Sequence, residues 1–351
     1  MPDLNHNNSP SIGIIANPVS ARDIRRIVAN ASNLQLADRV NIVLRILSAV
    51  ASLGVPRVLM MPDRCGLRTL LLRHLGRERN LHHAFPEVDF LDMEPTATVE
   101  DTFRAARMMR AARVRAIIVL GGDGTHRAVV RESNDLPIAG LSTGTNNAFP
   151  EMRESTITAM AVGLYATGRL TPEQALASNK VLEVSINEGQ RHDIALVDAV
   201  ISTDRYIGAR ALWKTESLAA VYLTFADPQA IGLSAIGGLL QPVGRREAGG
   251  LAIQLSDDPV HRRLVLRAPI APGMVRDVGI ANWEPMPAGR DFPVALEAGI
   301  VALDGEREMT FERGDRVRIT LRENAFPTVD VARCMQIAAE LGLFRHSSSN
   351  L

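Results

Sequence analysis

Short, continuous apolar runs alternate with longer stretches of helical periodicity over the first 150 residues. The apolar runs cover residues 12–16, 55–61, 88–91, 114–120 and 138–141. Between them, apolar residues recur at helical spacing in residues 34–53, 67–75 and 99–112. Uninterrupted apolar strands separated by amphipathic helices are typical of a parallel sheet that is covered on both faces. The pattern predicts a doubly wound α/β domain over residues 1–150.

The pattern changes after a further predicted helix at residues 155–168. The later strand-like runs are interrupted by Gly, Pro, Asn and Asp, and they cover residues 181–186, 194–201, 251–255, 263–267, 294–303 and 317–321. Helical periodicity is scarce there, so residues 151–325 are predicted to form a β-rich, sandwich-like domain. Helical spacing returns near the end of the chain. We expect residues 326–351 to form a helix that packs back on the first domain.

Composition narrows the classes of function. Hydrophobic residues make up 46% and charged residues 22% of the 351 residues, which is ordinary for a globular protein. The formal net charge is zero, so the bulk charge does not indicate a nucleic acid or an anionic membrane surface as partner. The polar N-terminus lacks the features of a signal peptide, and no apolar run is long enough to span a bilayer. We therefore expect a cytoplasmic protein.

The clearest chemistry follows the fourth apolar run, where the chain reads GGDGT. Adjacent glycines at the carboxyl end of a strand let backbone N–H groups approach phosphate oxygens, and a following helix adds partial positive charge. The residues predicted to bind a nucleotide triphosphate are Gly121, Gly122, Gly124 and Thr125. A carboxylate in such an anion site is explained if Asp123 binds Mg²⁺ or accepts a proton from an attacking hydroxyl. The alternative is a βα turn that needs glycine only for its shape.

Two better-known phosphate loops do not fit this stretch. A Walker A loop ends in GK[ST], and neither Lys180 nor Lys214 has these neighbours. A Rossmann fingerprint needs a glycine three residues after Gly124, where the chain has Arg127. The predicted phosphate loop is therefore of a third kind. His126 directly follows it, and the sequence fits equally a phosphate contact and an incidental residue at the start of a helix.

A second polar loop, STGTNN, follows the next apolar run. The carboxyl ends of neighbouring parallel strands meet at one edge of the sheet, so this loop is predicted to lie beside the first. Its hydroxyl and amide groups can bind phosphates and a sugar hydroxyl. The expected nucleotide contacts are Thr143, Gly144 and Thr145, and the expected acceptor contacts are Asn146 and Asn147. A polar βα turn with a helix cap is the alternative.

These two loops together resemble the superfamily of NAD kinases, diacylglycerol kinases and sphingosine kinases. Within it, the chain is most similar to the bacterial NAD-kinase-like branch of acetoin-catabolism X proteins. Residues 195–200, ALVDAV, stand where NAD kinases carry an Asn-Glu pair in a strand. Residues 303–305, LDG, resemble the late Asp-Gly hairpin of the second domain. The resemblance covers most of residues 11–322.

The resemblance implies a reaction and a set of ligands. It implies transfer of a phosphoryl group from ATP to a hydroxyl with Mg²⁺ at the phosphates, most simply conversion of NAD to NADP, in a role linked to acetoin catabolism. Asp123 would then be the general base or metal partner. Asp198 would join the two asparagines in orienting the acceptor. A homo-oligomer is likewise implied by the family.

The chain departs from the family where the acceptor is recognised. Val197 stands in place of the asparagine, so one amide that would face the dinucleotide is lost. The family's NAD-holding segment is TFADPQ here, at residues 224–229. We expect NAD to be a poor acceptor and Val197→Asn to improve its use. Three functions stay open: an NAD kinase, a kinase for another small hydroxyl compound or a lipid, and a nucleotide-binding sensor or accessory protein with little turnover.

Overall fold

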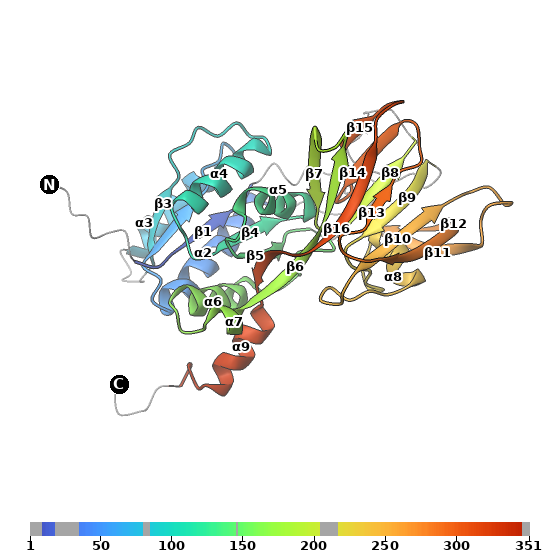
Figure 1. Ribbon diagram of the computed structural model, residues 1–351. Helices are drawn as coiled ribbons and strands as arrows, with labels where there is room; N and C mark the ends of the chain where they lie inside the picture. Colours follow the sequence, from blue (N-terminus) through green and yellow to red (C-terminus); the bar gives the residue numbers. More distant parts are fainter. Residues whose placement is uncertain (1–8, 18–34, 80–84, 145–146, 204–216, 346–351) are drawn as a thin grey trace.

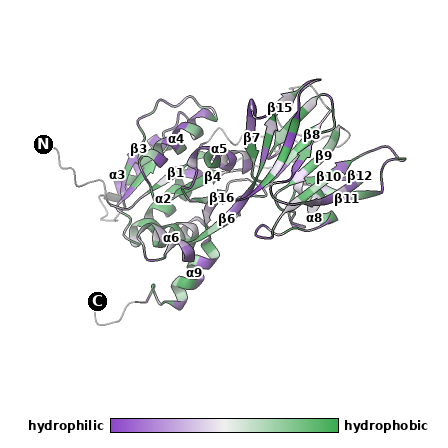
Figure 2. Ribbon diagram, viewed as in Figure 1, coloured by the Kyte–Doolittle hydropathy of each residue, from purple (hydrophilic) through white to green (hydrophobic). Residues whose placement is uncertain are grey.

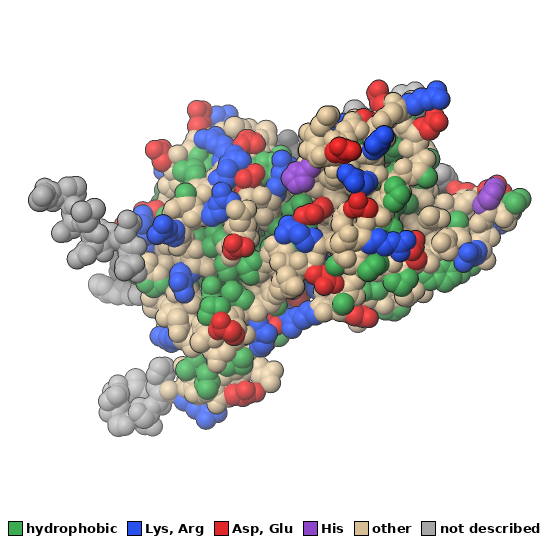
Figure 3. Space-filling view, viewed as in Figure 1, with side chains coloured by type: hydrophobic (Ala, Val, Ile, Leu, Met, Phe, Trp, Pro, Cys, Tyr) green, Lys and Arg blue, Asp and Glu red, His purple; other side chains and the backbone are tan. Residues whose placement is uncertain are grey.

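The computed structural model describes residues 9–17, 35–79, 85–144, 147–203 and 217–345. It has two lobes, an α/β lobe in blue and green and a β lobe in yellow and orange, which are joined by two long strands (Figure 1). Helices α4 and α9 alternate between hydrophobic and hydrophilic residues (Figure 2). Charged side chains of both signs are interspersed over one face of the molecule (Figure 3). In the described part of the chain, no helix is long and apolar enough to cross a membrane.

A parallel sheet forms the centre of the α/β lobe, with the strand order β3-β2-β1-β4-β5. Its strands are β1 (Ser11–Ile15), β2 (Arg57–Met60), β3 (Glu87–Phe90), β4 (Ile117–Gly121) and β5 (Ile138–Ser142). The helices between and after them are α2 (Leu36–Ser52), α3 (Leu67–Arg79), α4 (Glu100–Ala111), α5 (Asp123–Ser133) and α6 (Ser155–Ala166). All five predicted apolar runs form parallel strands, which confirms the α/β prediction.

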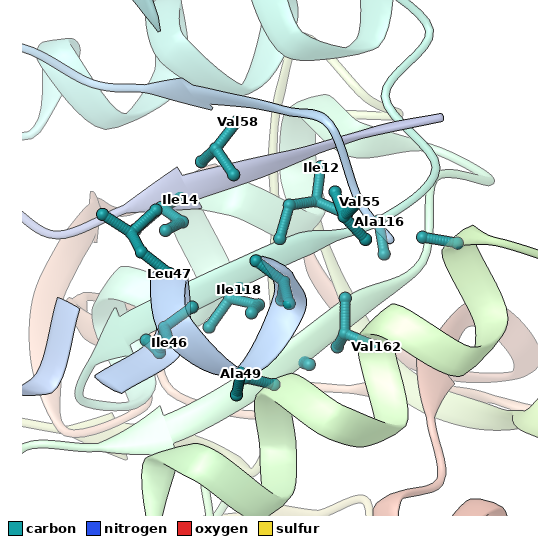
Figure 4. Packing of buried hydrophobic residues seen from close by; sticks show 14 of the residues in the cluster. Ile12, Ile14, Ile46, Leu47, Ala49, Val55, Val58, Ala116, Ile118 and Val162 are labelled. Atoms are coloured by element: carbon teal, nitrogen blue, oxygen red, sulfur yellow. The ribbon is translucent and has the colours of Figure 1, made fainter. Parts of the chain in front are cut away.

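The central strands β1 and β4 are buried on both faces, which explains why they are almost wholly apolar. On one face, Ile14 and Ile118 pack with Ile46 of α2 and Val162 of α6 (Figure 4). On the other face, alternate residues of the same strands pack against α4 and α5. Helices on both faces fix these strands, and the loops that begin at the carboxyl ends of the strands therefore start from fixed positions.

Two long antiparallel strands connect the lobes. They are β6 (Leu176–Ile186), which follows the short helix α7 (Pro172–Ala175), and β16 (Val317–Val329). At one end β16 pairs with β5, through Thr328 and Ile138, and so continues the parallel sheet. At the other end β7 (Arg191–Ala195) pairs with β6, and β13 (Asp291–Pro293) pairs with β16. One nine-stranded sheet thus runs through both lobes.

The β lobe is a sandwich of the far end of this sheet and a second, seven-stranded sheet. The strand order of the second sheet is β11-β12-β10-β9-β8-β14-β15. Its strands are β8 (Asp198–Ser202), β9 (Leu218–Leu223), β10 (Gly250–Leu255), β11 (Leu264–Ala271), β12 (Met274–Met286), β14 (Gly299–Leu303) and β15 (Glu306–Phe311). Buried residues such as Leu182, Ile319 and Val301 fill the space between the sheets. The predicted β-rich, sandwich-like second region is confirmed.

The structure differs from the sequence prediction in its details. Residues 194–201 were expected to form one strand, but the chain turns between β7 and β8 at Leu196 and Val197. Helix α8 (Ser234–Leu240) was not predicted, because its Gly237-Gly238 pair is typical of a loop. These glycines allow close packing instead: a Cβ on Gly237 would lie 2.1 Å from a Leu223 side-chain atom.

Helices α6 and α9 both pack in the core of the α/β lobe, although they lie outside residues 1–150. α9 (Val331–Glu340) packs against α6, and its Cys334 is fully buried in the core cluster that also contains the residues of α2. The boundaries at residues 150 and 325 stay predictions. We propose that the first unit continues through α6, because this helix packs on α2 in the same core.

Candidate functional site

The GGDGT loop connects the end of β4 to the start of α5, and its glycines are needed for space. Gly121 ends the strand, and Gly122 caps the helix in an extended conformation with a φ of −95°. A Cβ on Gly121 would lie 2.5 Å from the Cβ of Thr125, and a Cβ on Gly122 would lie 2.6 Å from Oδ1 of Asn147. Because such distances are below any normal contact, neither position accepts a larger residue without a shift in its neighbours.

The second loop lies directly beside the first, as predicted from the parallel strand order. The N–H of Thr143 donates to the carbonyl of Gly121 over 3.4 Å. Asn147 folds over Gly122, and its Nδ2 donates to Oγ of Ser142 at 2.8 Å. The two predicted contacts Thr145 and Asn146 lie outside the described residues. The remaining residues of both loops therefore form one continuous edge at the carboxyl end of the sheet.

The carboxylate of Asp123 bridges these two loops. One oxygen accepts the backbone N–H of Ala148 at 3.0 Å and the other accepts that of Phe149 at 2.8 Å. In the described part of the chain, no group of three or more His, Cys, Asp and Glu side chains is placed to hold a metal ion. Mg²⁺ commonly uses one or two protein carboxylates together with substrate phosphates, so a single Asp123 fits that mode and no closed protein cage is present among these residues.

Two threonine hydroxyls at this edge are buried without a hydrogen-bond partner among the described residues. They are Oγ1 of Thr125, a residue with 6% of its surface exposed, and Oγ1 of Thr143. Both residues are close to Gly121, one through its side chain and the other through its backbone. A buried hydroxyl without a partner costs about 1–3 kcal/mol, so a polar ligand that supplies the bond would bind favourably here.

His126 is a core residue and does not face this edge. It is fully buried, its Nδ1 lies 2.8 Å from the carbonyl oxygen of Gly122, and its ring packs against Phe149 at 5.8 Å between centroids. Burial lowers the pKa of His126 to about 4, so the imidazole is neutral near pH 7. Of the two alternatives for this residue, the structure favours the incidental one.

A buried carboxylate, Asp304, fixes the turn between β7 and β8. It begins the two-residue turn between β14 and β15, where both Asp304 and Gly305 have positive φ angles of 51° and 78°. Its carboxylate accepts the N–H groups of Leu196, Val197 and Asp198 at 2.8 to 3.3 Å. Because burial outweighs the nearby Arg127 guanidinium, the pKa of Asp304 rises to about 8.

Helix α5 is fixed to the β lobe by Arg127. Its Nη1 lies 3.3 Å from Asp193, and its Nε lies 3.6 Å from Asp304. The hairpin turn also brings Glu306 over the GGDGT loop, because a Cβ on Gly124 would lie 3.1 Å from Oε1 of Glu306. The position of the GGDGT loop is therefore set by both lobes.

The predicted acceptor contacts Asn147 and Asp198 do not line the same pocket. Asn147 lines an open pocket of about 350 Å³ between the lobes, together with Ser142 and Gly144. Asp198 is buried at the start of β8, with only 6% of its surface exposed, and is not part of that pocket's lining. Arg245, which enters the same pocket from the β lobe, was not predicted.

The residues that depart from the family pattern fill space with apolar groups. Val197 and Phe225 have 1% and 5% of their surfaces exposed, and they share one hydrophobic cluster with Phe149 and Phe326. This cluster lies where residues of both lobes meet. An asparagine at position 197, as in the family pattern, would place its side-chain amide inside this apolar cluster.

Known proteins are similar to both lobes. A model of the ATP-NAD kinase N-terminal domain matches residues 12–169, and a model of the acetoin catabolism protein X C-terminal domain matches residues 180–324. Acetoin catabolism protein X of Cupriavidus necator is 63% identical over 340 residues, which cover 96% of this chain and 94% of that protein. A crystal structure of yeast NADH kinase complexed with NADH aligns over 98% of this chain and 91% of its own, with a TM-score of 0.53 and 11% identity. At that identity the last similarity shows the fold alone.

Proposed function

This chain belongs to the acetoin catabolism protein X family, and from that premise we propose that it is an ATP-dependent phosphotransferase with a hydroxyl group as acceptor. The observation that carries the proposal is the pair of buried hydroxyls of Thr125 and Thr143 beside Gly121, which have no hydrogen-bond partner in the part of the chain that the structure describes. Two hydroxyl donors lie here beside the N-terminus of α5, and both kinds of group bind phosphate oxygens favourably. The match of residues 12–169 to the ATP-NAD kinase N-terminal domain supports ATP as the donor.

The roles of the residues follow from their positions. Thr125, Thr143 and the backbone of Gly121 to Gly124 would hold the triphosphate. Asp123 would hold Mg²⁺, which neutralises phosphate charge when bound, or would accept the proton that the acceptor hydroxyl loses as its oxygen forms the new bond to phosphorus. Asn147 would orient the acceptor from the pocket side. Phosphoryl transfer depends mostly on positioning and electrostatics, so these groups are a sufficient set.

The acceptor is the finer part of the proposal. NAD is the first candidate because of the ATP-NAD kinase match. The apolar cluster around Val197 and Phe225 favours a second candidate, another small hydroxyl compound, because it leaves fewer hydrogen-bonding groups for a dinucleotide. The name of the relative from Cupriavidus necator supports a role in acetoin catabolism for either reaction.

A protein that binds the nucleotide with little turnover is the remaining candidate. The observation in its favour is that both oxygens of Asp123 already accept backbone N–H groups, so this carboxylate has a structural role in joining the two loops. A structural role of this kind does not exclude a catalytic one.

Binding and turnover measurements with defined ligands separate these candidates. Stabilisation against heat is measured with Mg²⁺ and ATP, NAD, NADP or NADH, and ADP release is measured with NAD as acceptor. Stabilisation by both ATP and NAD with formation of NADP supports an NAD kinase. Stabilisation by ATP without NAD supports another acceptor, and binding without any ADP release supports the accessory role. A protein that binds no ATP would overturn the proposal.

A further inference from the structure

Arg245 reaches the pocket from a loop of the β lobe, between α8 and β10. Its guanidinium carbon lies 4.6 Å from the ring centroid of Phe225 and 5.2 Å from that of Phe149. Its Nη2 donates to the carbonyl oxygen of Ala148. The side chain is thus held between aromatic residues of both lobes, and its conformation is fixed before any ligand binds.

The loop that carries Arg245 is itself fixed by Lys180 of β6. The ammonium group of Lys180 donates to the carbonyl oxygens of Gly244, Glu247 and Gly249 at 3.3, 2.6 and 2.7 Å. All three ammonium protons are therefore used to hold this one loop. A buried lysine in this role is costly, which indicates that the position of the loop matters.

The guanidinium of Arg245 has donors left for a ligand. Among the described residues no carboxylate forms an ion pair with it. The charges of Glu151, Asp123 and Asp227 favour the charged form of Arg245 and oppose the lowering of its pKa by burial. Each of these carboxylates also has another partner: Glu151 pairs with Arg153, Asp227 accepts the N–H of Gln229, and Asp123 accepts two N–H groups. Its neighbour Arg246 points elsewhere and pairs with Asp330. Arg245 presents five N–H groups in a planar fork, and the bond to Ala148 uses one of its two terminal nitrogens.

We propose that Arg245 binds an anionic group, a phosphate or a carboxylate, on the molecule that receives the phosphoryl group. The pocket in which Arg245 lies also contains Asn147 and Ser142 of the second loop. The acceptor is then a hydroxyl compound that carries negative charge, and an uncharged alcohol such as a neutral lipid is a poor substrate. This inference rests on the proposed phosphotransferase function, which assigns the GGDGT loop and Thr143 to the triphosphate of ATP.

The test uses inorganic phosphate as the probe of this anion site. The full-length protein is first saturated with Mg²⁺ and a non-hydrolysable ATP analogue, and phosphate binding is then measured by calorimetry. R245M removes the charge and the fork but keeps an unbranched side chain. R246M is the matched control, because Arg246 is the adjacent residue and its side chain is 64% exposed.

The expected result is that R245M binds phosphate about 10- to 100-fold more weakly than the wild type, as for loss of hydrogen bonds to a charged group, while R246M stays within about twofold. The analogue should bind all three proteins with equal affinity. Equal phosphate affinity in R245M, or no phosphate binding by the wild type, overturns the proposal. Loss of analogue binding in R245M also overturns it, because Arg245 would then act only by holding Ala148.

Two further results keep the test decisive. If R245M does not fold, R245K takes its place, and its phosphate affinity should fall at least about threefold because an ammonium lacks the planar fork. Wild-type affinity in R245K would then contradict the proposal. If the wild type does not bind the ATP analogue, the phosphotransferase function fails separately, and the comparison of R245M with R246M is made on the analogue-free protein.

Discussion

Asp123 and Arg245 bind the same residue from opposite lobes: the Asp123 carboxylate accepts the N–H of Ala148 at 3.0 Å, and the Arg245 guanidinium donates to its carbonyl oxygen. The carboxylate belongs to the GGDGT loop and the guanidinium to the β lobe. Ala148 therefore connects the predicted catalytic residue to the pocket.

Asp123→Asn should reduce phosphotransfer by at least about 100-fold, because it removes the only charge placed to accept a proton within the loop. The amide nitrogen of asparagine cannot accept a backbone N–H, so one of the two bonds to Ala148 and Phe149 is also lost, at a cost of about 1–3 kcal/mol. Rates are measured by ADP release and stability by urea unfolding. Asp135→Asn, at an exposed position, is the control. Turnover within a factor of about three of the wild type would remove Asp123 from the mechanism.

Gly122→Ala should weaken ATP binding at least about tenfold. The new methyl group would lie 2.6 Å from Oδ1 of Asn147, so this amide must move away from the loop. Gly76→Ala in α3 is a matched control, because nothing lies within 4 Å of its Cβ position and alanine favours a helix by about 1 kcal/mol. Calorimetry with MgATP compares the two. Equal affinity in both variants would place the triphosphate elsewhere.

Asp304→Asn should remove a pH dependence of stability. The pKa of Asp304 is raised from its ordinary value of 3.8 to about 8 in the folded protein. Between these two pH values, the folded state keeps a proton that the unfolded state releases. The free energy of unfolding should therefore fall as pH rises from about 4 to 8, by up to about 1.4 kcal/mol per pH unit. Because His126 has a pKa of about 4 in the folded protein and its ordinary 6.5 when unfolded, it adds a smaller change of opposite sign near pH 6.5, which the Asp304→Asn variant shares with the wild type.

Urea unfolding at pH 6.5, 7.25 and 8 measures this slope. Asparagine tolerates the positive φ of position 304 and keeps one acceptor oxygen, so the variant should fold and show a flatter profile. A wild-type profile that is already flat would mean that Arg127 and the three backbone N–H groups keep the carboxylate ionised.

Val197→Asn should destabilise the protein and should not improve NAD use, which reverses the expectation from the family pattern. Val197 has 1% of its surface exposed in a cluster with Phe149 and Phe225, and an unpaired buried amide costs about 1–3 kcal/mol. Val197→Ala controls for lost packing. Unfolding in urea and initial rates of NADP formation are compared. Wild-type stability together with faster NADP formation would show that the amide reaches the ligand after all.

The sequence predicted the proximity of the two loops because it depends on strand order alone. Gly121 and Ser142 end neighbouring parallel strands, and this follows from apolar runs and the rule that ligands bind at the carboxyl ends of such strands. The contact of Asn147 with Gly122 is a consequence of that arrangement. Motif and topology were sufficient for this half of the site.

The other half of the site could not be predicted from the sequence. Arg245 lies about 100 residues after Ala148 and belongs to no motif, and only the packing of the two lobes brings it to Phe149. The role of Lys180 could not be predicted either, because its partners are backbone carbonyl groups, which do not depend on residue type. The burial of Asp198 and Val197 follows from a turn held by Asp304, more than 100 residues away in the chain.

Calorimetry of MgATP with Thr125→Val and Thr143→Val shows whether the loop edge around Gly121 binds the phosphates of ATP. Valine has nearly the same shape, and the hydroxyls it replaces have no partner among the described residues, so neither variant should lose stability. Thr158→Val in α6 is the control, because it also removes a buried, unpartnered hydroxyl but lies away from the loops. ATP affinity should fall about tenfold or more in each loop variant and stay unchanged in Thr158→Val. Wild-type ATP affinity in both loop variants would mean that the phosphates of ATP bind elsewhere.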